Sequence, residues 1–128
     1  MVDGFFDDLP VPDGWATMAV SCSALTPDRA HGGEIGLAEM ERVCGSPGLV
    51  VIVWPNHLDW LGEHGYTHLS FPGAMRMRFR SPREAAELTE IFYPAAAEEV
   101  RRRGRASVPY ELLGVNPPRD LAYKVKPA

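Results

Sequence analysis

The chain has 128 residues, of which 45% are hydrophobic and 23% are charged. This balance is typical of a folded globular protein, and the length suits an N-terminal arm (residues 1–14) followed by a single domain (residues 15–128). No run approaches the roughly 18 apolar residues of a membrane span, and the acidic start lacks the basic region of a secretory signal. The two cysteines match no zinc-ligand spacing, so we expect reduced thiols and a cytoplasmic protein.

The net charge of −4 is distributed unevenly along the sequence. Residues 1–66 carry ten carboxylates and two basic residues, whereas residues 67–128 carry seven carboxylates and eleven basic residues. Such a split either marks an anion-binding region or lets the two halves pair in the fold or with a partner.

The first third of the chain predicts an arm, a strand and a helix. Residues 1–14 are too rich in proline for a regular element, and we interpret them as an arm whose phenylalanines pack on the core. Residues 15–25 alternate with a period of two, which predicts a strand. Residues 34–44 carry apolar side chains three and four positions apart, which predicts an amphipathic helix that ends at Gly45.

The run from Leu49 to Trp54 is the centre of the predicted fold. Its six consecutive apolar residues are bounded by glycine and proline, as is typical of a strand buried on both faces. After this strand, Asn56 is placed to cap a short helix. We expect residues 68–71 to form a short extended piece beyond that helix.

A long helix is expected between residues 81 and 103. A serine cap, a proline in the first position and a capping-box glutamate begin it: Ser81, Pro82 and Glu84. Pro94 removes one hydrogen bond within the helix, so we expect a kink near Tyr93.

Three further strands complete the prediction. Residues 74–80 alternate methionine and phenylalanine with arginine, which predicts a strand with one face in water. Residues 110–113 and 120–126 flank a loop, and we predict that they pair antiparallel beside the strand at residues 49–54.

Several segments together resemble the second half of a class I S-adenosylmethionine-dependent methyltransferase. Residues 9–14 resemble the loop before that family's fourth strand, and residues 20–25 resemble the end of the strand itself. The helix, turn and fifth strand that follow in the family are matched by three features: Glu39, then Arg42-Val43, then Pro47-Gly48 before the apolar run.

This resemblance implies an α/β fold, namely a partial Rossmann-like, methyltransferase-type sheet with helices on both faces and a C-terminal antiparallel strand pair. The family's strand order is 3-2-1-4-5-7-6, and this chain would supply the last four strands. Its Gly-rich cofactor loop and the acidic residue after its second strand have no counterpart here, and Thr17 stands where the family usually has an aspartate. We therefore expect methyl transfer from S-adenosylmethionine only if a partner supplies the missing cofactor-binding half.

Two groups of polar residues are candidates for chemistry. The resemblance places Ser21, Ser23 and Leu25 along one side of the cofactor, at a strand end that faces the ligand crevice of an open α/β sheet. A second group, within twelve residues, offers the histidines and carboxylates that acid–base catalysis needs; its candidate catalytic residues are His57, Asp59 and His64. Its spacing matches no named zinc motif, and the alternative is a loop-rich connection with polar surface residues.

Two other functions stay open. A non-catalytic interaction protein would keep the architecture alone, and it would form a homodimer because the missing strands leave the edge of residues 17–23 unpaired. The alternative to this homodimer is that the N-terminal arm folds back over the edge within one chain. A nucleic-acid binder would use the arginine-rich segment of Arg76, Arg78 and Arg80.

Overall fold

The structure is a computed structural model that describes residues 3–116 and 118–128. The chain divides into two compact units, a sheet unit (residues 3–71 and 118–128) and a hairpin unit (residues 72–116). Each unit has its own cluster of buried apolar side chains. Within the described ranges, none of the helices has the length and apolar character that crossing a membrane requires.

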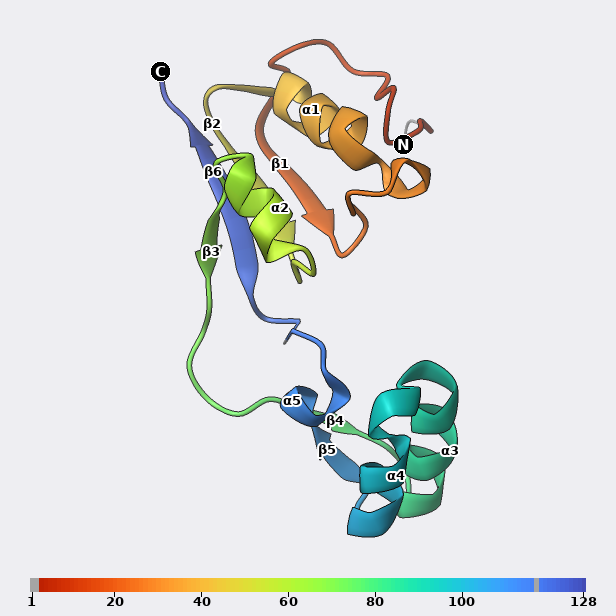
Figure 1. The fold of residues 1–128 in the computed structure, drawn as a ribbon. Coiled ribbons are helices and arrows are strands. Elements are labelled where there is room, and N and C mark those ends of the chain that lie inside the picture. The colour runs from red at the N-terminus through yellow and green to blue at the C-terminus, as the bar shows by residue number, and fades with distance from the viewer. Residues whose placement is uncertain (1–2, 117) are drawn as a thin grey trace. The chain divides into compact units, whose positions relative to one another are not determined.

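The sheet unit contains a mixed four-stranded sheet in the order β1-β2-β6-β3 (Figure 1). Strands β1 (Ala16–Cys22) and β2 (Cys44–Val53) are parallel. Strand β6 (Leu121–Lys126) is antiparallel to β2 and to β3 (Thr67–Leu69). The apolar run thus forms a central strand, as predicted, while β1 and β3 are the two edges.

Both α-helices of this unit contribute to one buried cluster. Helix α1 (Gly33–Val43) follows a short 3-10 helix, η1 (Arg29–His31), and helix α2 (Leu58–Glu63) follows β2. Their buried side chains pack with Val50 and Ile52 of β2. The helices therefore cover the same face of the sheet.

The opposite face of the sheet is open within this unit. Met18 and Val20 of β1 are 53% and 58% exposed, and Val125 of β6 is 61% exposed. The expectation of helices on both faces, and of a central strand buried on both, is therefore wrong for the sheet unit. An unbroken apolar run shows that a strand is central, but it does not show which elements cover it.

The hairpin unit combines two short strands with three helices. Strand β4 (Arg76–Arg78) pairs antiparallel with β5 (Ser107–Pro109). Between these strands lie α3 (Pro82–Phe92) and α4 (Pro94–Arg103), and α5 (Tyr110–Leu113) follows β5. The core comprises side chains from both long helices, β5 and α5: Ala85, Ala96, Val100, Val108 and Leu113.

The predicted long helix is in fact two helices that pack against each other. Tyr93, with φ −139° and ψ 58°, separates α3 from α4, so the chain reverses where only a kink was expected. Ile91 and Phe92 are apolar, yet they are 68% and 67% exposed because they end α3 at the reversal. The serine cap is as predicted, since Ser81 Oγ accepts a hydrogen bond from the Glu84 N–H. The predicted capping box differs, because the Glu84 carboxylate accepts its backbone hydrogen bond from Arg80 instead of Ser81.

The prediction of a strand at residues 110–113 is wrong, because this segment is the helix α5. Tyr110 and Leu113 are buried three positions apart, on one face of a helical turn, and Gly114 ends the turn in the left-handed conformation. The strand that pairs with β6 on its other side is β3, in the segment expected only to be extended. A four-residue apolar run fits either a strand or a helical turn.

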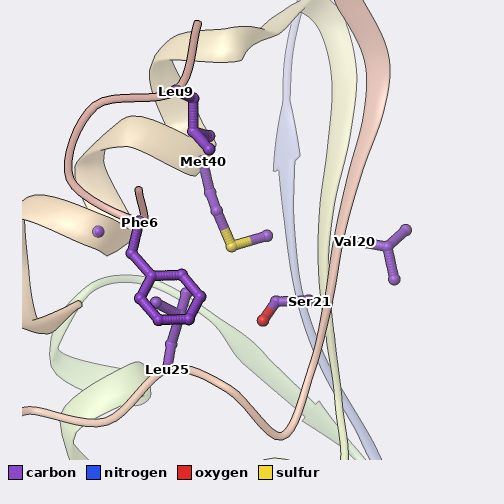
Figure 2. Close-up of a pocket in the computed structure, with 7 residues that line it drawn as sticks. Phe6, Leu9, Val20, Ser21, Leu25 and Met40 are labelled. Atoms are coloured by element: carbon purple, nitrogen blue, oxygen red, sulfur yellow. The ribbon is translucent and has the colours of Figure 1, made fainter. Parts of the chain in front are cut away.

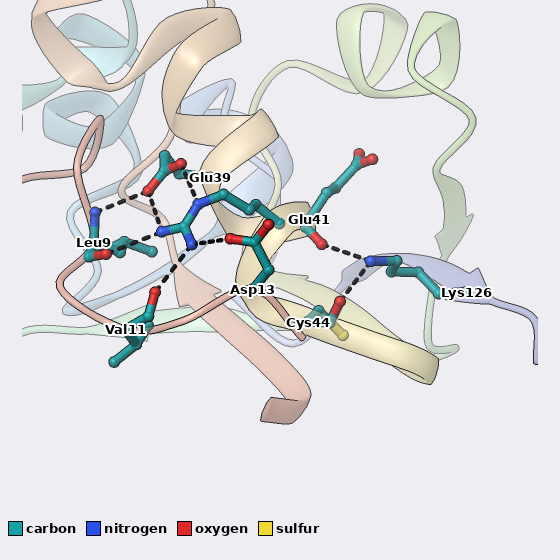
Figure 3. A network of polar contacts seen from close by, with 8 residues as sticks. Leu9, Val11, Asp13, Glu39, Glu41, Cys44 and Lys126 are labelled. Carbon is teal, nitrogen blue, oxygen red and sulfur yellow. Dashed lines mark hydrogen bonds and ion pairs between the residues drawn. The ribbon is translucent and has the colours of Figure 1, made fainter. Parts of the chain in front are cut away.

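The N-terminal arm is fastened to α1 through Arg42 (Figure 3). The Arg42 guanidinium donates hydrogen bonds to the carbonyl oxygens of Leu9 and Val11, both at 3.0 Å, and pairs with Asp13 at 2.7 Å. It also pairs with Glu39, whose carboxylate accepts a hydrogen bond from the Leu9 N–H.

The expectation that both phenylalanines of the arm pack on the core is wrong for Phe5, which is 80% exposed.

Candidate functional site

The carboxyl ends of β1 and β2 lie side by side and are held by polar contacts. Ser23 and Trp54, the first residues after the two strands, have positive φ angles of 49° and 57°. This conformation costs a non-glycine residue about 1–2 kcal/mol. The Ser23 N–H donates to the Val53 carbonyl at 2.9 Å, and the Asn56 amide donates to Ser23 Oγ at 3.1 Å. These bonds fix the edge at which open α/β sheets bind ligands.

A pocket of about 170 Å³ opens between the arm, β1 and α1 (Figure 2). The Phe6 ring, the Met40 thioether and the Leu25 side chain lie around it, and the Ser21 hydroxyl is directed toward them. The Val20 side chain points to the other side of β1. The pocket is therefore apolar with one hydroxyl, and it is smaller than the roughly 300–1,000 Å³ of typical small-molecule sites.

Two glycines allow the start of α1 to lie close to Leu25, one of the residues that line this pocket. Gly32 has φ 94°, and a Cβ there would lie 2.5 Å from Leu25 Cδ2. Gly36, in the first turn of α1, is buried, and a Cβ there would lie 3.1 Å from the same atom. These glycines are needed for the close approach of helix and Leu25.

The structure brings together two of the three predicted cofactor contacts. Ser21 and Leu25 both line the pocket, and Leu25 is only 8% exposed. Ser23 instead bonds to Asn56 at the strand end. Whether these residues touch a cofactor stays a prediction.

The three predicted acid–base residues do not form one hydrogen-bonded group in the structure. His57 precedes α2 and Asp59 lies in its first turn, and both are exposed. His64 Nδ1 donates a hydrogen bond to the Trp60 carbonyl at 2.8 Å, and its Nε2 contacts the Glu34 carboxylate. No group of three or more metal-ligating side chains is assembled among residues 3–116 and 118–128.

The partners of His64 raise its pKa and lower that of Glu34. The hydrogen bond to the Trp60 carbonyl is the largest cause of the raised His64 pKa, burial opposes it, and the Glu34 carboxylate adds to it. The pKa of Glu34 is lowered mainly by the hydrogen bond that its carboxylate accepts from the Trp60 indole N–H at 2.7 Å. These contacts join α2 to α1, so they have a structural role.

Asp120 is a polar residue of this edge that sequence analysis did not single out. It is 3% exposed, and its carboxylate accepts hydrogen bonds from the Ser70 hydroxyl and the Phe71 N–H. His68 Nε2 lies 3.5 Å from it. Its position at the start of a predicted strand carried no signal, because its partners are about fifty residues away in the sequence.

The arginine-rich segment lies in the hairpin unit and is exposed as predicted. Arg76 and Arg78 lie on the polar face of β4, while Met77 packs toward the unit's core. Arg80 lies beyond the strand, 3.8 Å from Glu84. The alternation therefore gives one polar and one apolar face, as the period of two indicates.

Comparison of the chain with models of known protein families gives no match, and a search among curated proteins gives none either. The strand order, the free edge of β1 and the pocket are therefore the observations from which function is inferred.

Proposed function

We propose that the sheet unit is the carboxyl-terminal half of a methyltransferase-type sheet, and that it acts on S-adenosylmethionine only when a second half pairs along β1. The observation that carries the proposal is the strand order. The observed order β1-β2-β6-β3 corresponds to the last four places, 4-5-7-6, of the family that the sequence resembles. In that order the edge of the fourth strand is the place where the cofactor-binding half begins.

The free edge of β1 is suited to accept another strand. Backbone N–H groups alternate in direction along a strand, and the Ser23 N–H points to β2. The N–H groups of Val20 and Cys22 therefore point away from β2, where no strand of the described chain pairs with them. Such a row of unpaired groups is a template for an added strand.

The pocket beside β1 supports the need for a second half. It supplies one hydroxyl, that of Ser21, and an apolar wall, but its lining residues include no Gly-rich loop whose backbone amides could bind the cofactor. A partner that pairs with β1 would place its own loop near the carboxyl end of this strand. The candidate acid–base residues His57 and Asp59 follow the carboxyl end of the neighbouring strand β2.

Calorimetry with S-adenosylmethionine tests the proposal in two experiments. The chain alone is expected to bind weakly or not at all, and a low-micromolar dissociation constant would contradict the need for a second half. A chimaera that joins the first three strands of a characterised class I methyltransferase to residues 9–128 is expected to bind. A folded chimaera without binding would show that the sheet unit is not such a half.

Substitutions of Val20 control for the pairing in that chimaera. Val20→Pro removes an outward N–H without touching the ladder to β2, so it is expected to weaken binding. Val20→Ala shortens the same side chain but keeps the N–H, and it is expected to bind like the parent chimaera. Equal behaviour of the two variants would contradict pairing through β1.

A second candidate function, an interaction protein that dimerises through β1, is favoured by the same edge. No arm residue from position 3 onward pairs with β1, and the polar contacts of the arm include those with Arg42 and Glu39 on α1. Trp15, 71% exposed, and Met18 add apolar surface beside the strand. A two-fold pairing of β1 strands would continue one sheet across two copies.

Light scattering up to high micromolar concentration tests the homodimer. The expected result is a dimer that Val20→Pro converts to a monomer, while Val20→Ala stays dimeric. A monomer throughout the concentration range would eliminate self-pairing, but it would leave the pairing with a separate cofactor half intact.

A further inference from the structure

A polar hollow in the hairpin unit gathers arginines from two parts of the sequence. It has a volume of about 440 Å³ and is lined by Arg76, Arg103, Arg105 and Ser107. Arg76 comes from β4, Arg103 ends α4, and Ser107 begins β5, so the antiparallel pairing of β4 and β5 assembles the hollow. We propose that this hollow binds the phosphate group of a small phosphorylated molecule.

The guanidinium of Arg76 is held in position before any ligand arrives. Its Nε donates to the Ser107 hydroxyl and its Nη2 to the Ser107 carbonyl, both at 2.8 Å. These two bonds leave three of the five guanidinium N–H groups for an acceptor. A fixed guanidinium binds an oxyanion with less loss of side-chain entropy than a free one, and its planar fork matches the geometry of phosphate.

The charges around the hollow are not balanced by carboxylates. Glu99 pairs with Arg103 at 2.6 Å and also with Arg102, so one carboxylate serves two arginines. Those hydrogen bonds lower the pKa of Glu99 to about 2, which keeps it ionised at neutral pH. Arg105 has no ion pair or hydrogen bond with any residue in the part of the chain that the structure describes.

One feature of the hollow opposes an anion. Arg103 and Gly104 lie at the carboxyl end of α4, where a helix carries roughly half an elementary negative charge. This partial negative charge is smaller than the net positive charge of the hollow, where three guanidinium groups face the single carboxylate of Glu99, which is shared with Arg102. The electrostatic balance therefore favours an anion.

The surroundings favour a small phosphate compound over a nucleic acid. The chain has a net charge of −4, which repels a long polyanion, whereas a local group of arginines still attracts a compact one. The hollow has no aromatic side chain on which a base could stack. Arg80, the third residue of the arginine-rich segment, is near Glu84 and does not line the hollow.

Calorimetric titration with inorganic phosphate and with glycerol phosphate tests the proposal at low salt. Both probes are expected to bind, and Arg105→Met is expected to lower their affinity about tenfold, since it removes a charged donor. Arg83→Met is the matched control, because Arg83 is exposed and pairs with Glu87 away from the hollow. The control is expected to bind like the parent chain.

Three results would overturn the proposal. The first is no heat of binding with either phosphate probe on the folded chain. The second is an equal loss of affinity in Arg105→Met and Arg83→Met, which would indicate general charge attraction. The third is a single-stranded oligonucleotide that binds through Arg105 more tightly than glycerol phosphate, with a steep salt dependence, which would assign the surface to nucleic acid.

Discussion

Replacing Arg42 by methionine should detach the N-terminal arm and destabilise the sheet unit. Methionine keeps an unbranched apolar stem but has no donors, so the change removes only those contacts in Figure 3 that Arg42 makes, and little packing. The lost contacts are the hydrogen bonds to the Leu9 and Val11 carbonyls and the pairs with Glu39 and Asp13.

The magnitude follows from the exposure of each contact. Asp13 is 82% exposed, so its pair with Arg42 should contribute little. The arginine itself is 30% exposed and Glu39 only 16%, so the bonds to Glu39 and to the two carbonyls are partly shielded from water. Allowing about 1 kcal/mol for each of these three connections, the free energy of unfolding should fall by about 2–3 kcal/mol.

The loss should also depend on pH. The pKa of Glu39 is lowered from 4.5 to about 2, first by its hydrogen bonds from Arg42 and then by the Leu9 N–H, against the effect of burial. A carboxylate whose pKa is lowered by folding stabilises the native state above its unfolded pKa, and this contribution is lost as the pH falls toward 2. The difference in the free energy of unfolding between the parent chain and Arg42→Met should therefore have its full value at pH 7 and decrease below about pH 4.5.

Urea unfolding followed by tryptophan fluorescence is the assay, because all three tryptophans lie in the sheet unit: Trp15, Trp54 and Trp60. Arg29→Met is the matched control, since Arg29 is exposed and forms no ion pair within the described ranges. Equal stability of the two variants at pH 7, or a difference that does not change with pH, would refute the reasoning.

Two further predictions concern the same unit. His64→Gln should reduce stability more at pH 6 than at pH 9, because the raised pKa of His64 contributes stability below its unfolded pKa that is lost as the pH rises through the folded value; a pH-independent loss in urea unfolding would argue against this. Leu37→Ala should cost about 2–5 kcal/mol, because Leu37 is only 1% exposed in the core and its removal leaves a cavity. A loss below 1 kcal/mol in the same assay would mean that the core around α1 collapses to fill the space.

The sequence alone was sufficient for elements whose signals are local. The period of two in residues 15–25, the apolar run at residues 49–54 and the cap at Ser81 predicted β1, β2 and the start of α3. Periodicity and capping depend on neighbours within a few positions, so they can be found without knowing the fold. The alternating arginines of β4 were predicted on the same basis.

The tertiary structure decided the features that depend on distant partners. It made residues 110–113 a helix, because Tyr110 and Leu113 could be buried together, and it gave β6 the partner β3. It brought Arg42 to an arm about thirty residues away and placed Arg105 beside Arg76. A short apolar run or a single charged residue carries no record of its partner, because pairing and burial are set by contacts that only the folded chain makes.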